Sequence, residues 1–151
     1  MKKNQLIITG MTITIGGMIY ILFRTQSLIM FDWFKMLLLE EHIEKLRSSS
    51  MLYIKKLPNW FLFSFPDGLW LFSYISLIFI VWKNQINRHS IIWIFIIPFY
   101  AISLEIGQLL NYFKGTFDFN DLFFYAIGII SPFIIFNNLL TLKLKHYEQK
   151  S

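Results

Sequence analysis

The sequence contains no cysteine, which excludes disulfide bonds, zinc–thiolate centres and a cysteine nucleophile. Charge is also scarce, because only 15% of the 151 residues are charged, against about 25% in a typical soluble domain. Apolar residues take their place: 56% of the chain is hydrophobic and 19% is aromatic. Such a chain has too much apolar surface to stay disordered, and a small soluble core cannot hide it all. These proportions predict an integral membrane protein.

The formal net charge is +5, from 14 Lys and Arg against 9 Asp and Glu. Proteins that bind nucleic acid gather their basic residues on one wettable face or arm, whereas here they lie between long apolar runs. Membrane proteins carry such a basic excess for topological reasons. The sequence therefore predicts the lipid bilayer as a partner and predicts no nucleic acid.

Four apolar stretches approach the roughly 20 residues that a helix needs to cross a bilayer core. They cover about residues 5–23, 66–82, 91–112 and 121–141. Pro66 predicts the start of the second stretch, because proline is well tolerated in the first turn of a helix. The sequence thus predicts an all-α fold, with residues 1–151 forming a single domain built as a four-helix membrane bundle.

A further segment, about residues 28–47, lies between the first two stretches. Its apolar front part is too short to cross a membrane and contains Asp32 and Lys35. Its back part alternates in charge, as a solvent-exposed helix does. This pattern predicts one amphipathic helix at the membrane interface.

An even number of spans places the N-terminus, the loop 83–90 and the C-terminal tail on one side of the membrane. The basic residues divide evenly between the two sides, but those on the terminal side lie in short segments next to the spans. Basic residues in such short segments favour the cytoplasm. Both termini are therefore expected to be cytoplasmic.

Polar residues gather at the opposite, non-cytoplasmic ends of the predicted spans. The candidate ligand-binding residues are Asp67, Glu105, Gln108, Asp118, Asp121 and Tyr125, with Arg24 and Arg47 as candidate counter-charges. Glu105 is the most informative, because a carboxylate at the bilayer centre costs about 2.5–3.5 kcal/mol and needs an interior partner. Two roles for it stay open: a site residue, or a structural tie between helices through Gln108 or Tyr125.

Crowded carboxylates raise one another's pKa unless a cation neutralises them, so this site is expected to receive protons, a metal ion or a cationic ligand group. A divalent cation, if one binds, would be held by Glu105, Asp118 and Asp121. The sequence shows no Ser–His–Asp arrangement. No catalytic residue is assigned, and enzymatic activity stays open.

Three motifs near the C-terminus resemble the signature of the VanZ-like family: residues 105–108 (EIGQ), residues 115–121 (GTFDFND) and Gly128. The family consists of small bacterial membrane proteins named for a teicoplanin-resistance member. Its pattern is an E-x-x-Q at a helix end, a short loop, an aspartate that opens the last helix, and a glycine seven residues later. The resemblance covers about residues 102–132. It implies a multi-pass protein of the bacterial cytoplasmic membrane with a role in the cell envelope.

The chain departs from this family pattern at three positions, where it has Gly115 in place of a common arginine, Tyr125 in place of asparagine and Leu71 in place of histidine. These departures indicate a divergent branch, so antibiotic resistance as such is not carried over. The expected function is binding of an envelope lipid or a glycopeptide-like headgroup at the non-cytoplasmic face. A small cation or solute transporter and a metal-assisted enzyme that acts on lipid headgroups are the alternatives.

Overall fold

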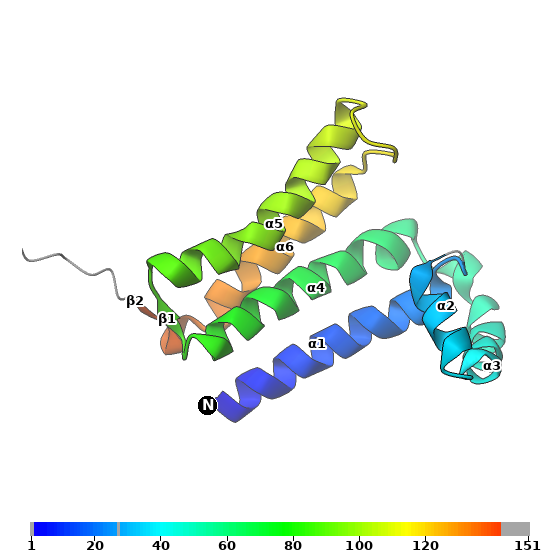
Figure 1. The fold of residues 1–151 in the computed structure, drawn as a ribbon, viewed down its shortest axis with the longest axis horizontal. Coiled ribbons are helices and arrows are strands. Elements are labelled where there is room, and N and C mark those ends of the chain that lie inside the picture. The colour runs from blue at the N-terminus through cyan, green and yellow to red at the C-terminus, as the bar shows by residue number, and fades with distance from the viewer. Residues whose placement is uncertain (1, 27, 143–151) are drawn as a thin grey trace, which may run out of the picture.

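The structure is a computed structural model that describes residues 2–26 and 28–142 (Figure 1). Helices dominate it, as the long apolar runs predict. Its elements, with 3-10 turns labelled η, are α1 (Lys2–Phe23), α2 (Ile29–Met36), α3 (Glu40–Met51), η1 (Ile54–Lys56), α4 (Asn59–Val81), β1 (Gln85–Ile86), α5 (Arg88–Leu109), α6 (Phe119–Ile135), η2 (Asn137–Leu139) and β2 (Thr141–Leu142).

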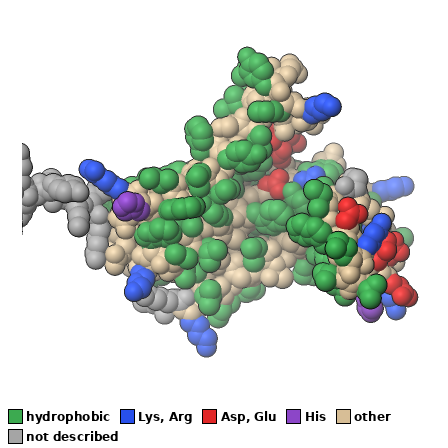
Figure 2. Space-filling view, viewed as in Figure 1, with side chains coloured by type: hydrophobic (Ala, Val, Ile, Leu, Met, Phe, Trp, Pro, Cys, Tyr) green, Lys and Arg blue, Asp and Glu red, His purple; other side chains and the backbone are tan. Residues whose placement is uncertain are grey.

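Three helices, α1, α4 and α5, are long and apolar enough to cross a membrane. The helix α6 is also apolar but has 17 residues. Figure 2 shows hydrophobic side chains spread over the long helices, while the charged side chains gather at the two ends of the molecule and in the hollow beside the protruding end of α5. This distribution is that of an integral membrane protein, as the composition predicts.

The central helix is α4, which packs along α1 on one side and along α6 on the other. Helix α6 comes unusually close to α4 at a pair of glycines. A Cβ added to Gly128 would lie 2.3 Å from the carbonyl oxygen of Gly68, and a Cβ added to Gly68 would lie 2.7 Å from the carbonyl oxygen of Phe124. Since real Cβ atoms do not approach so closely, only glycine allows this contact between the two backbones.

The main hydrophobic cluster lies in the half of the bundle toward the C-terminal end of α4. It joins Ile75, which is fully buried, to Phe79 on the same helix, Ile94 on α5 and Phe136 after α6. The ring of Phe79 packs edge-on against Phe133, with centroids 5.1 Å apart. This cluster holds α4, α5 and α6 together in that half.

The same end, here called the strand end, is closed by polar contacts. The side-chain amides of Gln5 and Asn84 are buried and bond each other in both directions, at 3.0 and 3.2 Å. Strands β1 and β2 pair in parallel beside them, and the N–H of Thr141 donates to the Asn84 carbonyl oxygen at 2.8 Å. The start of α1 and the end of the described chain thus lie at one end of the bundle. Residues 143–151, part of the predicted basic tail, lie outside the described residues.

The structure corrects the start of the second predicted span. Helix α4 begins at Asn59, after the extended N-cap residue Pro58, and Pro66 lies buried inside it. The chain from Trp60 to Phe65 is as apolar as the chain that follows, so the helix extends backward through the proline. Neighbouring helices can satisfy the backbone group that an internal proline frees.

The other predicted boundaries also shift. Helix α1 begins at Lys2 and not at residue 5, and α5 covers Arg88–Leu109 and not 91–112. Asn87 and Ser90 form a capping box that starts α5. The last helix ends at Ile135 and not at residue 141, because the chain after it forms η2 and then pairs with β1.

The segment predicted as one amphipathic helix is two helices, α2 and α3 (Figure 1). The chain reverses between them at residues 37–39, where Leu38 adopts a left-handed φ of 57°. A surface ion pair between Lys35 and Glu40, at 3.6 Å, bridges this reversal. Alternation of charge does not reveal the break, because the alternating run begins only at Glu40, after the reversal.

Candidate functional site

The end of α1, the start of α4, the end of α5 and the start of α6 meet at the other end of the bundle, here called the acidic end. The local sequence explains how α6 starts there. Asp118 is its N-cap residue and accepts a hydrogen bond from the backbone N–H of Asn120 at 2.8 Å. Asp121 lies in the first turn, where a carboxylate is favoured by the helix dipole.

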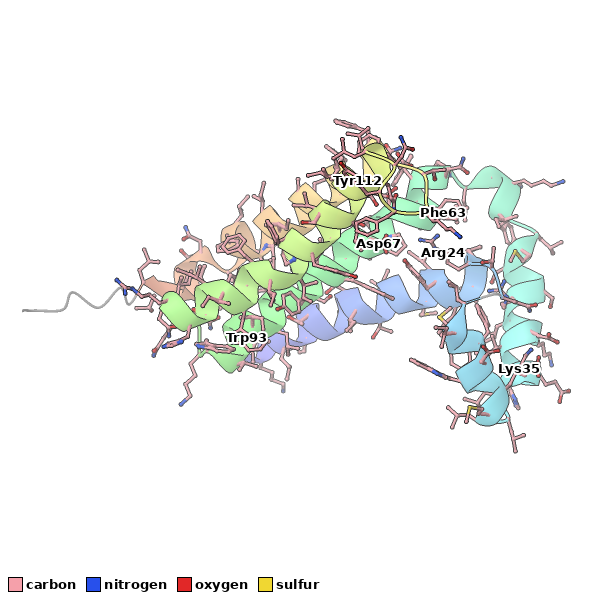
Figure 3. All side chains as sticks on the ribbon, turned by 45° about the horizontal axis from the view of Figure 1, so that its top comes forward. Arg24, Lys35, Phe63, Asp67, Trp93 and Tyr112 are labelled. Carbon is pink, nitrogen blue, oxygen red and sulfur yellow. The ribbon has the colours of Figure 1, made fainter. Side chains whose placement is uncertain are left out.

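Asp67 of α4 is held from α1. The hydroxyl of Tyr20 donates to Asp67 Oδ1 at 2.6 Å, and the guanidinium of Arg24 donates in turn to the Tyr20 hydroxyl at 3.1 Å. The same guanidinium lies over the rings of Tyr20 and Phe63, 4.6 and 4.7 Å from their centroids. Figure 3 shows Arg24, Phe63 and Asp67 together at this end, far from Trp93. Of the two predicted counter-charges, Arg24 is therefore beside the carboxylates.

Among the carboxyl groups that the structure describes, Glu105 of α5 has the lowest relative exposure, 5%. It accepts a backbone hydrogen bond from Asp118, and it interacts electrostatically with Asp121 and Asp67. Its Oε2 atom is buried and has no hydrogen-bond partner among the residues that the structure describes. Hydrogen bonds from Gln108 or Tyr125 to Glu105, which a structural tie would require, are likewise absent from the described part of the chain.

Helix α6 contributes Asp121 and Tyr125 from the same face, as their spacing predicts. Both are half-buried, and Tyr125 interacts electrostatically with Asp67, Glu105 and Asp121. Figure 2 shows acidic side chains in the hollow between the protruding end of α5 and the α2–α3 end of the molecule. We call the group Tyr20, Arg24, Asp67, Glu105, Asp121 and Tyr125 the carboxylate site.

Three atoms of the carboxylate site, here called the open polar atoms, are buried without a hydrogen-bond partner in the described ranges 2–26 and 28–142. They are Glu105 Oε2, Asp121 Oδ1 and Arg24 Nε. A buried polar atom left without a partner costs about 1–3 kcal/mol, so such atoms are rare in stable structures unless something else satisfies them.

Two predicted site residues lie at the margin. The backbone of Asp118 reaches Glu105, but its side chain caps α6. The Gln108 side chain packs against the loop between α5 and α6: a Cβ on Gly115, which has a φ of 147°, would lie 2.7 Å from the Gln108 amide carbon. Gln108 therefore supports the loop rather than the carboxyls.

Arg47 does not act as a counter-charge. It is 6% exposed on α3, and its guanidinium donates to the carbonyl oxygens of Ile21 and of Arg24, the latter at 2.7 Å. These carbonyls belong to the end of α1, where the last turn leaves acceptors without helical partners. Burial lowers the pKa of the Arg47 guanidinium, and the Glu44 carboxylate partly offsets that shift. Arg47 thus joins the α2–α3 pair to α1.

The sequence reasoning did not assign Tyr20 to the site, although it is the direct partner of Asp67. Its ring stacks on Trp70 of α4, with centroids 4.6 Å apart, so packing also holds it there. The available signal was its position four residues before Arg24, which places both side chains on one helix face.

A metal centre is not supported by the geometry. Within the described residues, no group of three or more His, Cys, Asp or Glu side chains is placed to hold a metal ion. Glu105, Asp118 and Asp121, the predicted ligands of a divalent cation, lie near one another without forming such a set. The carboxylates can instead accept hydrogen bonds from a cationic group that is rich in N–H donors.

Comparison of the chain with family models, with curated proteins and with solved structures gives no significant match.

Proposed function

We propose that this chain is a VanZ-like integral membrane protein that binds an envelope lipid or a glycopeptide-like headgroup at its acidic end. The residues that carry the family resemblance support this proposal, because Glu105 of the first motif and Asp121 of the second converge on the carboxylate site. Gly128 of the third motif makes the close contact between α6 and α4 that places Asp121 and Tyr125 beside Asp67.

The same proposal places the protein in a bacterial cytoplasmic membrane with both termini in the cytoplasm and the acidic end outside. Helix α6 is then the fourth span, since 17 residues of helix rise about 26 Å, close to the thickness of a bilayer core. The α2–α3 pair lies at the outer interface. Trp33 and Leu38, which are 61% and 88% exposed, support that placement because water alone would not favour such exposure.

The observation that carries the binding function is the buried carboxylate of Glu105 with its open oxygen Oε2. Within the carboxylate site, three carboxyl groups face one guanidinium, so the site attracts positive charge. A ligand that donates N–H groups satisfies the open carboxylate oxygens and removes the repulsion between the acids.

The deeper polar groups of the bundle favour binding over transport. Thr12 and Ser73 bond each other at 2.7 Å, and Gln5 bonds Asn84 at the strand end. These groups satisfy one another across helix contacts and are therefore not free to bind a solute that moves inward from Glu105.

Retention of membrane lipid by the purified protein tests the proposal. The full chain is purified in a mild detergent, and a total polar lipid extract of a bacterial membrane is titrated in while the unfolding midpoint is followed. Wild type is expected to be stabilised by the extract, and Glu105→Gln, which keeps the shape of the side chain, is expected to lose most of that stabilisation.

The matched control is Glu41→Gln, which removes the same charge from an exposed position on α3. It is expected to respond like wild type. An equal response of wild type and Glu105→Gln would show that Glu105 is structural and would remove the proposed binding site.

A further inference from the structure

The open polar atoms of the carboxylate site are of two opposite kinds. Glu105 Oε2 and Asp121 Oδ1 are acceptors on acidic groups, whereas Arg24 Nε is a donor on a cation. A simple cation cannot satisfy all three atoms, because it has no acceptor for the Arg24 N–H. They also do not fit a simple anion, which the carboxylates would repel.

The two kinds of atom come from different sides of the site. Arg24 follows α1 and is positioned by stacking on Tyr20 and Phe63, so its guanidinium cannot turn freely toward the acids of the other helices. Glu105 comes from α5 and Asp121 from α6. Asp67 interacts electrostatically with both Arg24 and Asp121, and its carboxylate already accepts a hydrogen bond from the Tyr20 hydroxyl at 2.6 Å. The site therefore has a cationic side and an anionic side.

On the basis of the proposed function, we propose that the ligand is a zwitterion with a primary ammonium group and an oxyanion close together. The ammonium is received by Glu105 and Asp121, because its three N–H donors can bond both carboxylates at once. The oxyanion, a phosphate or a carboxylate, is received by Arg24, whose planar guanidinium suits such groups.

Two sources supply this chemistry: a phosphoethanolamine lipid headgroup in the membrane, and a soluble zwitterion such as a short peptide. Binding to the full chain in detergent is measured with four probes. These are short-chain lipids with phosphoethanolamine, phosphocholine and phosphoglycerol headgroups, and the soluble dipeptide alanyl-alanine. Phosphocholine keeps the charges but lacks N–H donors, and phosphoglycerol lacks the cation.

We expect the phosphoethanolamine lipid to bind at least tenfold more tightly than the phosphocholine and phosphoglycerol lipids. Tight binding of the dipeptide with weak binding of all three lipids would also support the zwitterion and would identify a soluble source. Glu105→Gln and Arg24→Gln are each expected to weaken binding of the preferred probe at least tenfold. Glu40→Gln, at an exposed position on α3, is the control and is expected to bind as wild type does.

The selectivity of wild type among the probes does not depend on any variant folding. Equal binding of all three lipids, still weakened by Glu105→Gln, would overturn the zwitterion and leave the proposed binding function in place. Binding that Glu105→Gln reduces but a folded Arg24→Lys or Arg24→Gln leaves unchanged would do the same. Absence of any binding sensitive to Glu105→Gln would remove both proposals.

Discussion

Among single residues, Gly68 and Gly128 set the distance between α4 and α6, and through it the geometry of the carboxylate site. Asp67 directly precedes Gly68, and Tyr125 lies on the α6 face that also carries Gly128. Any side chain at either glycine pushes the two helices apart, because the atoms it would meet are backbone atoms that cannot rotate away.

Gly128→Ala is therefore expected to destabilise the protein by about 1–3 kcal/mol, the usual cost of overpacking a tight contact. The free energy of unfolding in mixed detergent micelles measures the effect. Gly10→Ala is the control, since a Cβ there meets nothing within 4 Å. It should leave stability unchanged or raise it by up to about 1 kcal/mol, because alanine favours a helix more than glycine does. Equal effects of the two substitutions would contradict the close contact.

Tyr20→Phe removes only the hydroxyl that joins Asp67 to Arg24, while the ring keeps its stacking on Trp70. Hydrogen bonds to charged groups contribute about 1.5–3 kcal/mol, so a loss of that size in unfolding free energy is expected. The same substitution combined with Asp67→Asn should cost less than the sum of the two single losses, because both remove one interaction. Tyr100→Phe, at a 60% exposed ring, should change nothing. Additive losses would disprove the coupling.

The sequence identified most members of the carboxylate site from the cost of burying charge. Glu105 stands out inside an apolar run, and Asp67 and Asp121 follow from the alternating direction of the helices. Tyr20 could not be found in the same way, since its partner is 47 residues away on another helix and a tyrosine in a membrane span is not costly. The placement of Arg47 was missed because its acceptors are backbone carbonyls, which every residue has.

At the scale of elements, Arg47 makes the hydrogen bonds that join the α2–α3 pair to the end of α1. Arg47→Ala removes the bonds to the carbonyls of Ile21 and Arg24 and the contact of the guanidinium with the Phe31 ring, 4.8 Å from its centroid. Amide hydrogen exchange in α2 and α3 should then rise by about tenfold or more, while exchange in α4 stays the same. Lys45→Ala, at an exposed position on α3, should not change exchange in these helices. Unchanged exchange in Arg47→Ala would show that other contacts hold the pair.

The existence of the long helices could be predicted, because each is a long apolar run, but several boundaries could not. Pro66 carries the same local signal at a helix start as inside a helix, and only packing against neighbouring helices decides between them. The reversal at Leu38 requires a left-handed backbone conformation, and residues 37–39 contain no glycine that would indicate it in the sequence. The pairing of β1 with β2 involves two residues on each side, too few for any periodicity.

For the whole molecule, the proposed orientation makes a prediction that the absence of native cysteine simplifies. Ser49 on α3 and His89 at the start of α5 are both exposed and lie on opposite sides of α4 in the chain. A membrane-impermeant maleimide should label Ser49→Cys in intact cells and His89→Cys only after permeabilisation. The reverse pattern would invert the orientation, and labelling of both in intact cells would show that α4 does not separate them across the membrane.

The strand end of the bundle is held together by more contacts than the acidic end, and this affects how α5 can tilt. The amide pair, the parallel strands and the hydrophobic cluster all lie toward the strand end, whereas α5 protrudes at the acidic end (Figure 1). A helix of 22 residues is a lever about 33 Å long. Pivoting it by only ~10° about its fastened end moves the free tip by ~6 Å, more than the width of a side chain. A small tilt of α5 about its fastened end is thus magnified at the acidic end, where the proposed ligand would meet Glu105.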